Sequence, residues 1–297
     1  MSGSHIRVLP LLLAAALGLT PQFAQAFAFD TAIEPFSVVP NQTTGTPVVW
    51  AFPQVMMNVQ LGSVPPGTTL DNGTTSWDTT VAEASALWNT VVPNFFTMDT
   101  TEADPCDRHN GVNTIAFAHD HCGDSFGDVV ALTRKSYRLR SGHFFLAEAD
   151  VLLNANFCWN VYTGPLHLCE KTLRLTYAID IQRVLLHELG HVLGLEHPDD
   201  AGQRVVAIMN SHLSDVDTLT QDDRDGAVFL YSQRLLAAPL QASSGSGSGG
   251  GCTLRPGTGV NPTLGGVFLL LAVCRTWIRT RLAPAGERGT ARQSEIG

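Results

Sequence analysis

The sequence predicts an α+β or α/β fold for residues 27–236, and two observations lead to this prediction. Short apolar, β-branched stretches alternate with two amphipathic helical stretches, in the order strands, helix, strands, helix, without tandem repeats. A chain of 297 residues with 44% hydrophobic residues also carries enough apolar side chains for a packed core. We therefore expect one globular domain between two terminal regions of different composition.

The N-terminal region, residues 1–26, has the three-part layout of a secretory signal. His5 and Arg7 give a weakly basic start, an apolar run follows, and small residues stand at Ala24 and Ala26. The apolar run from Val8 to Leu19 is too short to span a bilayer. The pattern predicts export, with cleavage after Ala26.

Four stretches of the domain are predicted as strands because they are apolar and rich in β-branched or aromatic residues. The first is Thr46 to Leu61, where Pro53 suits an edge or a bulge, and the second is Val112 to His119. Asp128 to Tyr137 and His143 to Asn154 are expected to follow as two more strands, joined by a polar turn.

Two stretches are predicted as helices from their apolar periodicity. The first covers residues 79–92, where Thr80 and Glu83 have the spacing of a capping box. The second begins after Asp180, which can cap it, and ends at Gly194, which permits a left-handed turn. Its core-facing stripe comprises Ile181, Val184, Leu185, Leu189, Val192 and Leu193.

The second helix also carries the residues of a metal site. His187 and His191 are four residues apart, so both imidazoles project from one helix face. The turn at Gly194 lets the chain come back, which brings His197 toward the same point. Three neutral nitrogen ligands with a fourth position left for water are typical of a catalytic zinc site rather than a structural one.

Glu188 directly follows the first of these ligands, where it can sit beside the metal-bound water. A zinc ion lowers the pKa of bound water to about 7 and polarises a carbonyl group. Glu188 is then the predicted general base, which takes the proton of the water and later delivers it to the leaving amine. The short His-Glu-x-x-His pattern recurs by chance, but the full spacing to Gly194 and His197 is far more specific.

At this point the stretch resembles the metzincin metallopeptidases. Met209 stands twelve residues after His197, where these enzymes carry a methionine turn, and Leu219 to Tyr231 is similar to the closing helix of the matrixin branch. The resemblance covers roughly residues 47–232. It implies an α+β fold with a twisted mixed sheet of about five strands and two long helices, the active-site helix and a C-terminal helix below one catalytic zinc. Met209 would be the apolar floor of the site, not a ligand.

The sequence also departs from the family pattern. Asn210, Ser211 and His212 follow the methionine, where the astacin and serralysin branches place a tyrosine. No cysteine lies between Phe27 and Pro47, so the latching cysteine of vertebrate matrixins has no counterpart there.

Many matrixins bind further ions in their central loops, and calcium or a second zinc is an open expectation here. The carboxylate oxygens of these loops suit calcium, although oxygen-rich loops are common on surfaces without any metal. The spacing of the candidate ligands along the chain does not reproduce the family pattern well. The residues concerned are His119, Asp120, His121, Asp124, Asp128, His143, Glu148 and Asp150.

Four of the six cysteines lie in the globular domain, and export would let them form disulfides. The expected bridges are local, Cys106 to Cys122 and Cys158 to Cys169, although four cysteines allow three pairings. Zinc binding by these cysteines is disfavoured because none belongs to a Cys-x-x-Cys pair.

The C-terminal part of the chain changes composition sharply. Residues 237–258 contain a Gly/Ser tract, which predicts a flexible linker. Residues 259–297 contain a short apolar run followed by an arginine cluster, and they resemble the C-terminal sorting signals of Gram-negative bacterial surface proteins. A plain membrane anchor is the alternative. In a sorting signal, Cys252 would be the point of attachment or modification.

A net charge of −9 with 18 Lys and Arg residues disfavours a nucleic-acid partner, because binding phosphates requires clustered basic residues. The sequence thus predicts a monomeric zinc endopeptidase that acts on polypeptides and is secreted or attached to the cell envelope. The alternative function is a surface binding or adhesion module that is stabilised by metal without turnover. Glu188 argues against that alternative, since a structural site does not need the carboxylate.

Overall fold

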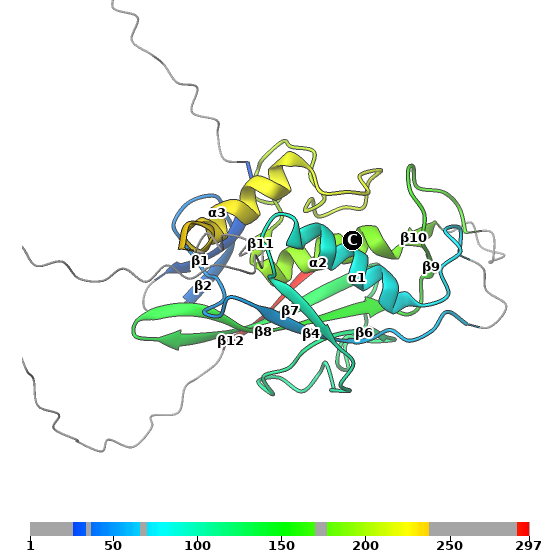
Figure 1. Ribbon diagram of the computed structural model, residues 1–297, viewed down its shortest axis with the longest axis horizontal. Helices are drawn as coiled ribbons and strands as arrows, with labels where there is room; N and C mark the ends of the chain where they lie inside the picture. The colour runs from blue at the N-terminus through cyan, green and yellow to red at the C-terminus, as the bar shows by residue number, and fades with distance from the viewer. Residues whose placement is uncertain (1–25, 34–36, 66–69, 170–176, 238–289, 297) are drawn as a thin grey trace, which may run out of the picture.

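The computed structural model describes residues 26–33, 37–65, 70–169, 177–237 and 290–296 (Figure 1). The predicted signal, except Ala26, and most of the predicted linker and sorting segment lie outside these residues. Within the described part of the chain, no helix is long and apolar enough to cross a membrane.

One mixed sheet forms the centre of the fold, with strand order β12-β7-β8-β6-β4-β5. The pairs β4·β5, β4·β6 and β6·β8 are parallel, whereas β7 runs antiparallel to both β8 and β12. Five of these strands belong to the globular domain, as predicted, and β12 is a sixth that the sequence did not predict. The strands are β4 (Val55–Gln60), β5 (Phe96–Asp99), β6 (Asn113–Ala118), β7 (Ala131–Arg140), β8 (His143–Asn154) and β12 (Thr290–Ile296).

In the described part of the chain, three helices accompany the sheet. Helices α1 (Trp77–Asn89) and α2 (Ile181–Leu193) contact each other and cover one face of the sheet, while α3 (Gln221–Ala237) lies beside β1 (Figure 1). Trp88 of α1 and nearly all of α2 are buried in the core between helices and sheet. This arrangement confirms the predicted α+β fold.

Two smaller sheets flank α2. Antiparallel pairing joins β1 to β11, β2 and β3, and β9 pairs in parallel with β10 immediately before α2 begins. The N-terminal strand β1 therefore lies next to the chain that leaves α2. These strands are β1 (Ala28–Ile33), β2 (Ser37–Gln42), β3 (Thr46–Pro47), β9 (Cys158–Asn160), β10 (Ala178–Asp180) and β11 (Leu195–Glu196).

The start of α1 corrects the predicted capping box. The helix begins earlier, at Trp77, because Ser76 has an extended backbone and its Oγ accepts a hydrogen bond from the N–H of Asp78 at 3.3 Å. Thr80 lies inside the first turn, where its hydroxyl donates to the carbonyl of Trp77 at 2.6 Å. A Thr hydroxyl can bond within a helix as well as cap it, so the pattern alone chose the wrong residue.

The predicted strand from Thr46 to Leu61 is also wrong as a single element. It is divided into β3 and β4 by a turn that contains Pro53, which lacks the N–H that a strand ladder needs. The strand predicted from Asp128 is shifted toward the C-terminus, since β7 covers Ala131–Arg140. The strand predicted from His143 to Asn154 is confirmed with its bounds as β8.

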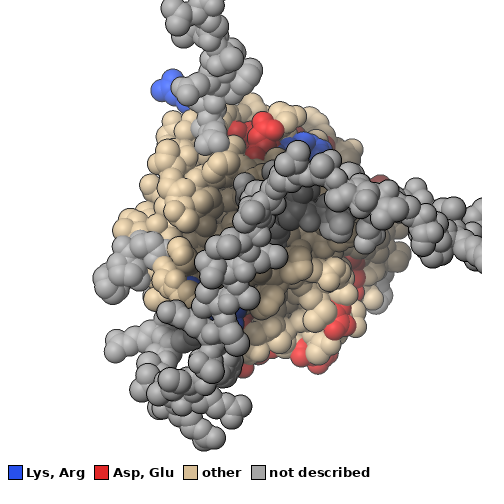
Figure 2. Space-filling view, turned by 60° about the vertical axis from the view of Figure 1, so that its left-hand side comes forward, with Lys and Arg blue, Asp and Glu red and all other residues tan. Residues whose placement is uncertain are grey.

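The surface of the domain is mixed in character. On the face shown in Figure 2, acidic side chains form small separate groups, and few basic side chains are visible between them. Most of the described surface on that face belongs to uncharged residues.

Candidate metal centre

Helix α2 has the two ends that its sequence predicts. The carboxylate of Asp180 accepts hydrogen bonds from the N–H groups of Gln182 at 3.3 Å and Arg183 at 3.1 Å. Gly194 ends the helix with φ of 105°, a left-handed conformation that favours glycine. The chain then turns back through β11, which returns His197 to the face that carries the first two imidazoles.

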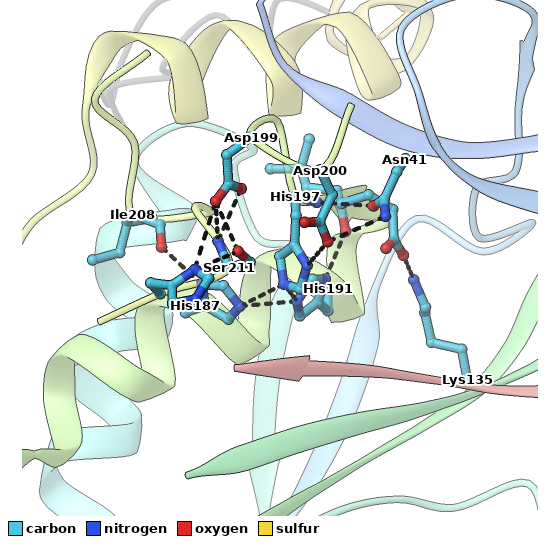
Figure 3. A network of polar contacts seen from close by, with 12 residues as sticks. Asn41, Lys135, His187, His191, His197, Asp199, Asp200, Ile208 and Ser211 are labelled. Atoms are coloured by element: carbon cyan, nitrogen blue, oxygen red, sulfur yellow. Dashed lines mark hydrogen bonds and ion pairs between the residues drawn. The ribbon is translucent and has the colours of Figure 1, made fainter. Parts of the chain in front are cut away.

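The three imidazoles converge on one point (Figure 3). Their Nε2 atoms are 3.0 Å apart between His187 and His191, 3.1 Å between His191 and His197, and 3.2 Å between His187 and His197. Four-coordinate zinc with Zn–N bonds of about 2.0–2.1 Å separates its ligand nitrogens by roughly 3.3 Å. The three nitrogens are thus spaced almost as this ion requires.

The other ring nitrogens show which atoms are left for a cation. Each Nδ1 lies at hydrogen-bond distance from an oxygen that can only accept, so Nδ1 carries the proton of the neutral ring. Each Nε2 then presents a lone pair, and three lone pairs facing one another at these distances repel unless a cation lies among them. The acceptors are Ile208 O for His187 (2.8 Å), Leu195 O for His191 (2.9 Å) and Asp200 Oδ2 for His197 (3.1 Å).

Burial keeps the three rings neutral. It lowers the pKa of His187 to about 3, with help from the nearby His197, and it lowers the pKa of His191 well below the ordinary value. Burial also lowers the pKa of His197, although Asp200 opposes this effect. Neutral imidazole is the form that binds metal, so the triad fits a zinc ion at neutral pH.

The predicted base lies between the helix and the sheet. Glu188 is fully buried, and the hydroxyl of Thr133 on β7 donates to its Oε2 at 2.6 Å. This contact fixes the carboxylate on the side of α2 that faces β7. Sequence reasoning did not identify Thr133, because this residue is far from Glu188 along the chain.

Met209 packs under the helix that carries the triad. It is buried, and a Cβ atom built on Gly190 would overlap its Sδ and lie 3.2 Å from Cζ2 of Trp88. The methionine therefore approaches the helix backbone between His187 and His191, where only glycine leaves room. The role of Met209 as the floor of a metal site stays a prediction.

Two carboxylates hold the chain around Met209. Asp223, at the start of α3, accepts hydrogen bonds from the N–H groups of Ile208 at 3.0 Å, Met209 at 3.2 Å and Thr220 at 2.7 Å. Asp199 accepts from the hydroxyl of Ser211 at 2.7 Å. Asp223 thus connects the start of α3 to the chain around Met209.

A buried ion cluster stands beside the third imidazole. Lys135 of β7 is fully buried, lies 2.7 Å from Oδ2 of Asp30 and also contacts the carboxylate of Glu196. Burial alone lowers the pKa of this lysine, but Asp30 and Glu196 outweigh the effect, so its pKa is raised. The cluster joins β7 to β1 and to β11, just before His197, and was not anticipated from the sequence.

Two loop histidines and one loop acid that could have bound a further ion make hydrogen bonds to nearby groups instead. Nδ1 of His119 lies 3.2 Å from Oδ1 of Asn156, Nε2 of His121 lies 2.9 Å from the carbonyl of Ser125, and Asp120 accepts from the N–H of Gly123 at 2.7 Å. Among the residues that the structure describes, only the His187, His191 and His197 group brings three such side chains within reach of one ion.

Glu148 and Asp150 also accept hydrogen bonds from backbone N–H groups. Glu148 accepts from the N–H groups of His109 at 2.7 Å and Gly111 at 2.6 Å, and Asp150 accepts from Thr114 at 3.0 Å. Burial, together with the charge of Glu148, raises the pKa of Asp150 to about 8. These contacts give the calcium prediction no support.

Both predicted disulfides are present. Cys106 is bonded to Cys122 with a Cα–Cα distance of 5.4 Å, and Cys158 is bonded to Cys169 with a Cα–Cα distance of 6.3 Å. The second bridge stands at β9, next to the strand that leads into α2.

Comparison with known proteins agrees with this geometry. The matrixin family model matches residues 67–232, more than half of the chain, and this segment contains the triad, Met209 and Asp223. The chain is also similar to Metalloendoproteinase 2-MMP of Arabidopsis thaliana, with 32% identity over 120 residues. That match covers 40% of this chain and 29% of the relative, so the chain spans less than a third of the relative's length. The chain belongs to the matrixin family of metallopeptidases.

Proposed function

We propose that this protein is a zinc-dependent endopeptidase in which His187, His191 and His197 hold the metal and Glu188 is the general base. The observation that carries the proposal is the convergence of three neutral Nε2 atoms at 3.0–3.2 Å. The matrixin family implies zinc, and the name of the Arabidopsis relative supports a polypeptide as the substrate.

The proposed chemistry divides between the ion and Glu188. Zinc in this site would supply a Lewis acid that polarises the scissile carbonyl and lowers the pKa of water. The carboxylate of Glu188 takes the proton of the attacking water, and it returns that proton to the amine nitrogen as the C–N bond breaks. Thr133 holds the carboxylate in one orientation during both transfers, through its hydrogen bond to Oε2.

The substrate would bind in extended form along β7. Among the five domain strands, β7 lies at one edge of the sheet, and its residue Thr133 contacts Glu188. A peptide that adds to a sheet edge gains backbone hydrogen bonds, which suit an endopeptidase acting on many sequences.

Export and envelope attachment are part of the proposal. The composition of residues 1–26 and 259–297 supports them, as do the two disulfides, which persist in oxidising compartments.

A Glu188→Gln variant of the full chain tests the proposal. Because the amide cannot take a proton from water, we expect casein and peptide cleavage to fall by about 10²-fold or more. The zinc content should stay unchanged, since the three imidazoles remain. The matched control is Glu83→Gln, at an exposed position of α1, which should keep full activity.

Two outcomes would contradict the proposal. Full activity of the Glu188→Gln variant would show that this residue is not the base. A wild-type chain that retains zinc but cleaves no polypeptide would favour the binding or adhesion module instead.

A further inference from the structure

The C-terminal strand β12 occupies the outer edge of β7. Seven consecutive residues pair antiparallel without a register shift, from Thr290 opposite Tyr137 to Ile296 opposite Ala131. Figure 3 shows β12 running along β7 past the helix that carries the triad. The segment Thr290–Ile296 contains no proline or glycine, both of which weaken strands.

The register places this strand at the proposed catalytic centre. Ser294 is opposite Thr133, the residue whose hydroxyl donates to Glu188. Arg292 is opposite Lys135, whose ion cluster includes the carboxylate of Glu196, next to His197. The strand thus covers the part of β7 that adjoins both the proposed base and the third imidazole.

One edge of a strand offers one row of N–H and C=O groups, so it can pair with only one other strand at a time. We propose that β12 is an intrachain occupant of the substrate edge, which an extended polypeptide must displace before cleavage. This inference rests on the proposed function. Removal of the chain after Cys252, as the predicted sorting signal implies, would carry β12 away and free the edge.

Truncation of the chain after Gly289 tests this inference. If β12 leaves the edge free only about one-fifth of the time, the apparent affinity for substrate is lowered about fivefold, because only the free fraction can bind. We therefore expect the truncated protein to cleave a fluorogenic peptide with a KM about fivefold lower and kcat unchanged. The synthetic peptide Thr-Ala-Arg-Gln-Ser-Glu-Ile-Gly, added to the truncated protein, should raise KM again as a competitive inhibitor.

A matched pair of proline variants tests whether the effect on KM comes from the pairing of β12 with β7 or only from the presence of the C-terminal tail. Ser294→Pro introduces a residue without an N–H into β12 and should behave like the truncated protein. Ser248→Pro makes the same change in the Gly/Ser tract and should behave like the full chain.

Hydrogen exchange supplies a readout that does not depend on activity. Truncation should speed exchange in the segment 131–137 of β7, which loses its partner strand, while β8 stays protected. Equal KM values and equal exchange in both proteins would overturn the inference. A KM difference that appears only at high protein concentration would assign the tail to a second copy and overturn the intrachain contact. If no protein cleaves the peptide, the proposed function fails, and hydrogen exchange still decides whether β12 covers β7.

Discussion

Asp223 shows how a single residue can connect the site to the rest of the domain. Its buried carboxylate accepts a hydrogen bond from the N–H of Thr220, immediately before α3. It also accepts hydrogen bonds from the N–H groups of Ile208 and Met209. The carbonyl of Ile208 is in turn the acceptor for Nδ1 of His187. The orientation of the first imidazole therefore depends on this carboxylate through one intervening residue.

Replacement of the two adjacent aspartates should have different consequences for stability. Asp223→Ala leaves several buried donors without an acceptor, each costing about 1–3 kcal/mol, so we expect a loss of at least about 3 kcal/mol in unfolding free energy. Asp222 is half-buried, and burial together with the charge of Asp223 raises its pKa to about 6. Asp222→Ala should thus be neutral or slightly stabilising at pH 7. Urea denaturation of both variants measures the difference, and equal losses would refute the role of Asp223.

The residues that sequence reasoning placed correctly are those whose roles depend on short spacings. The two imidazoles of α2, the cap at Asp180 and the turn at Gly194 follow from positions three or four residues apart. Thr133 could not be found in this way, because its contact with Glu188 exists only once β7 lies against α2. Local periodicity carries no information about which strand will meet which helix.

At the scale of elements, α2 is tied to three other parts of the fold by side-chain hydrogen bonds. Its carbonyl groups accept hydrogen bonds from the Nε1 of Trp50 (2.6 Å, to Val192), the Nε1 of Trp88 (2.9 Å, to Leu186) and the hydroxyl of Tyr231 (2.7 Å, to Leu193). These three aromatic residues come from three different parts of the chain. They hold the middle and the C-terminal end of the helix, the part that carries the two imidazoles.

The contact between Gly190 and Met209 can be tested with a double-mutant cycle. Alanine favours a helix by about 1 kcal/mol over glycine, but here its Cβ overlaps the methionine, so Gly190→Ala should lower the unfolding free energy. Met209→Ala should cost about 2–5 kcal/mol by opening a cavity. In the double variant the new Cβ has room, and the loss should be smaller than the sum by about 1 kcal/mol or more. Strictly additive losses, measured by urea denaturation, would contradict the packing described here.

Prediction of the elements was most accurate where one periodic pattern fills the whole element. The bounds of β8 and both ends of α2 agree with their patterns. The stretch from Thr46 to Leu61 was misjudged because its apolar residues continue through a turn. The pairing of β12 could not be predicted, since a polar seven-residue segment becomes a strand only through the edge it joins.

At the scale of the whole molecule, segments from distant parts of the chain meet around the third imidazole. Oδ1 of Asn41 accepts from the N–H of His197 at 3.2 Å, and its amide donates to Asp200 at 3.4 Å. Lys135 connects the same region to Asp30 of β1. A metal ion bound by the triad would join α2 to His197, which these contacts connect to β1, β2 and β7, so its binding should stabilise the domain.

Zinc content is the most direct test of the claim that the triad is a metal centre. We predict about one zinc ion per purified wild-type chain, by elemental analysis, because three neutral imidazoles converge at the spacing of a zinc site. His191→Ala should abolish zinc binding, whereas His143→Ala, at an exposed position outside the triad, should keep it. Zinc retained at the wild-type level in His191→Ala, or a wild-type chain that binds no zinc, would contradict the account.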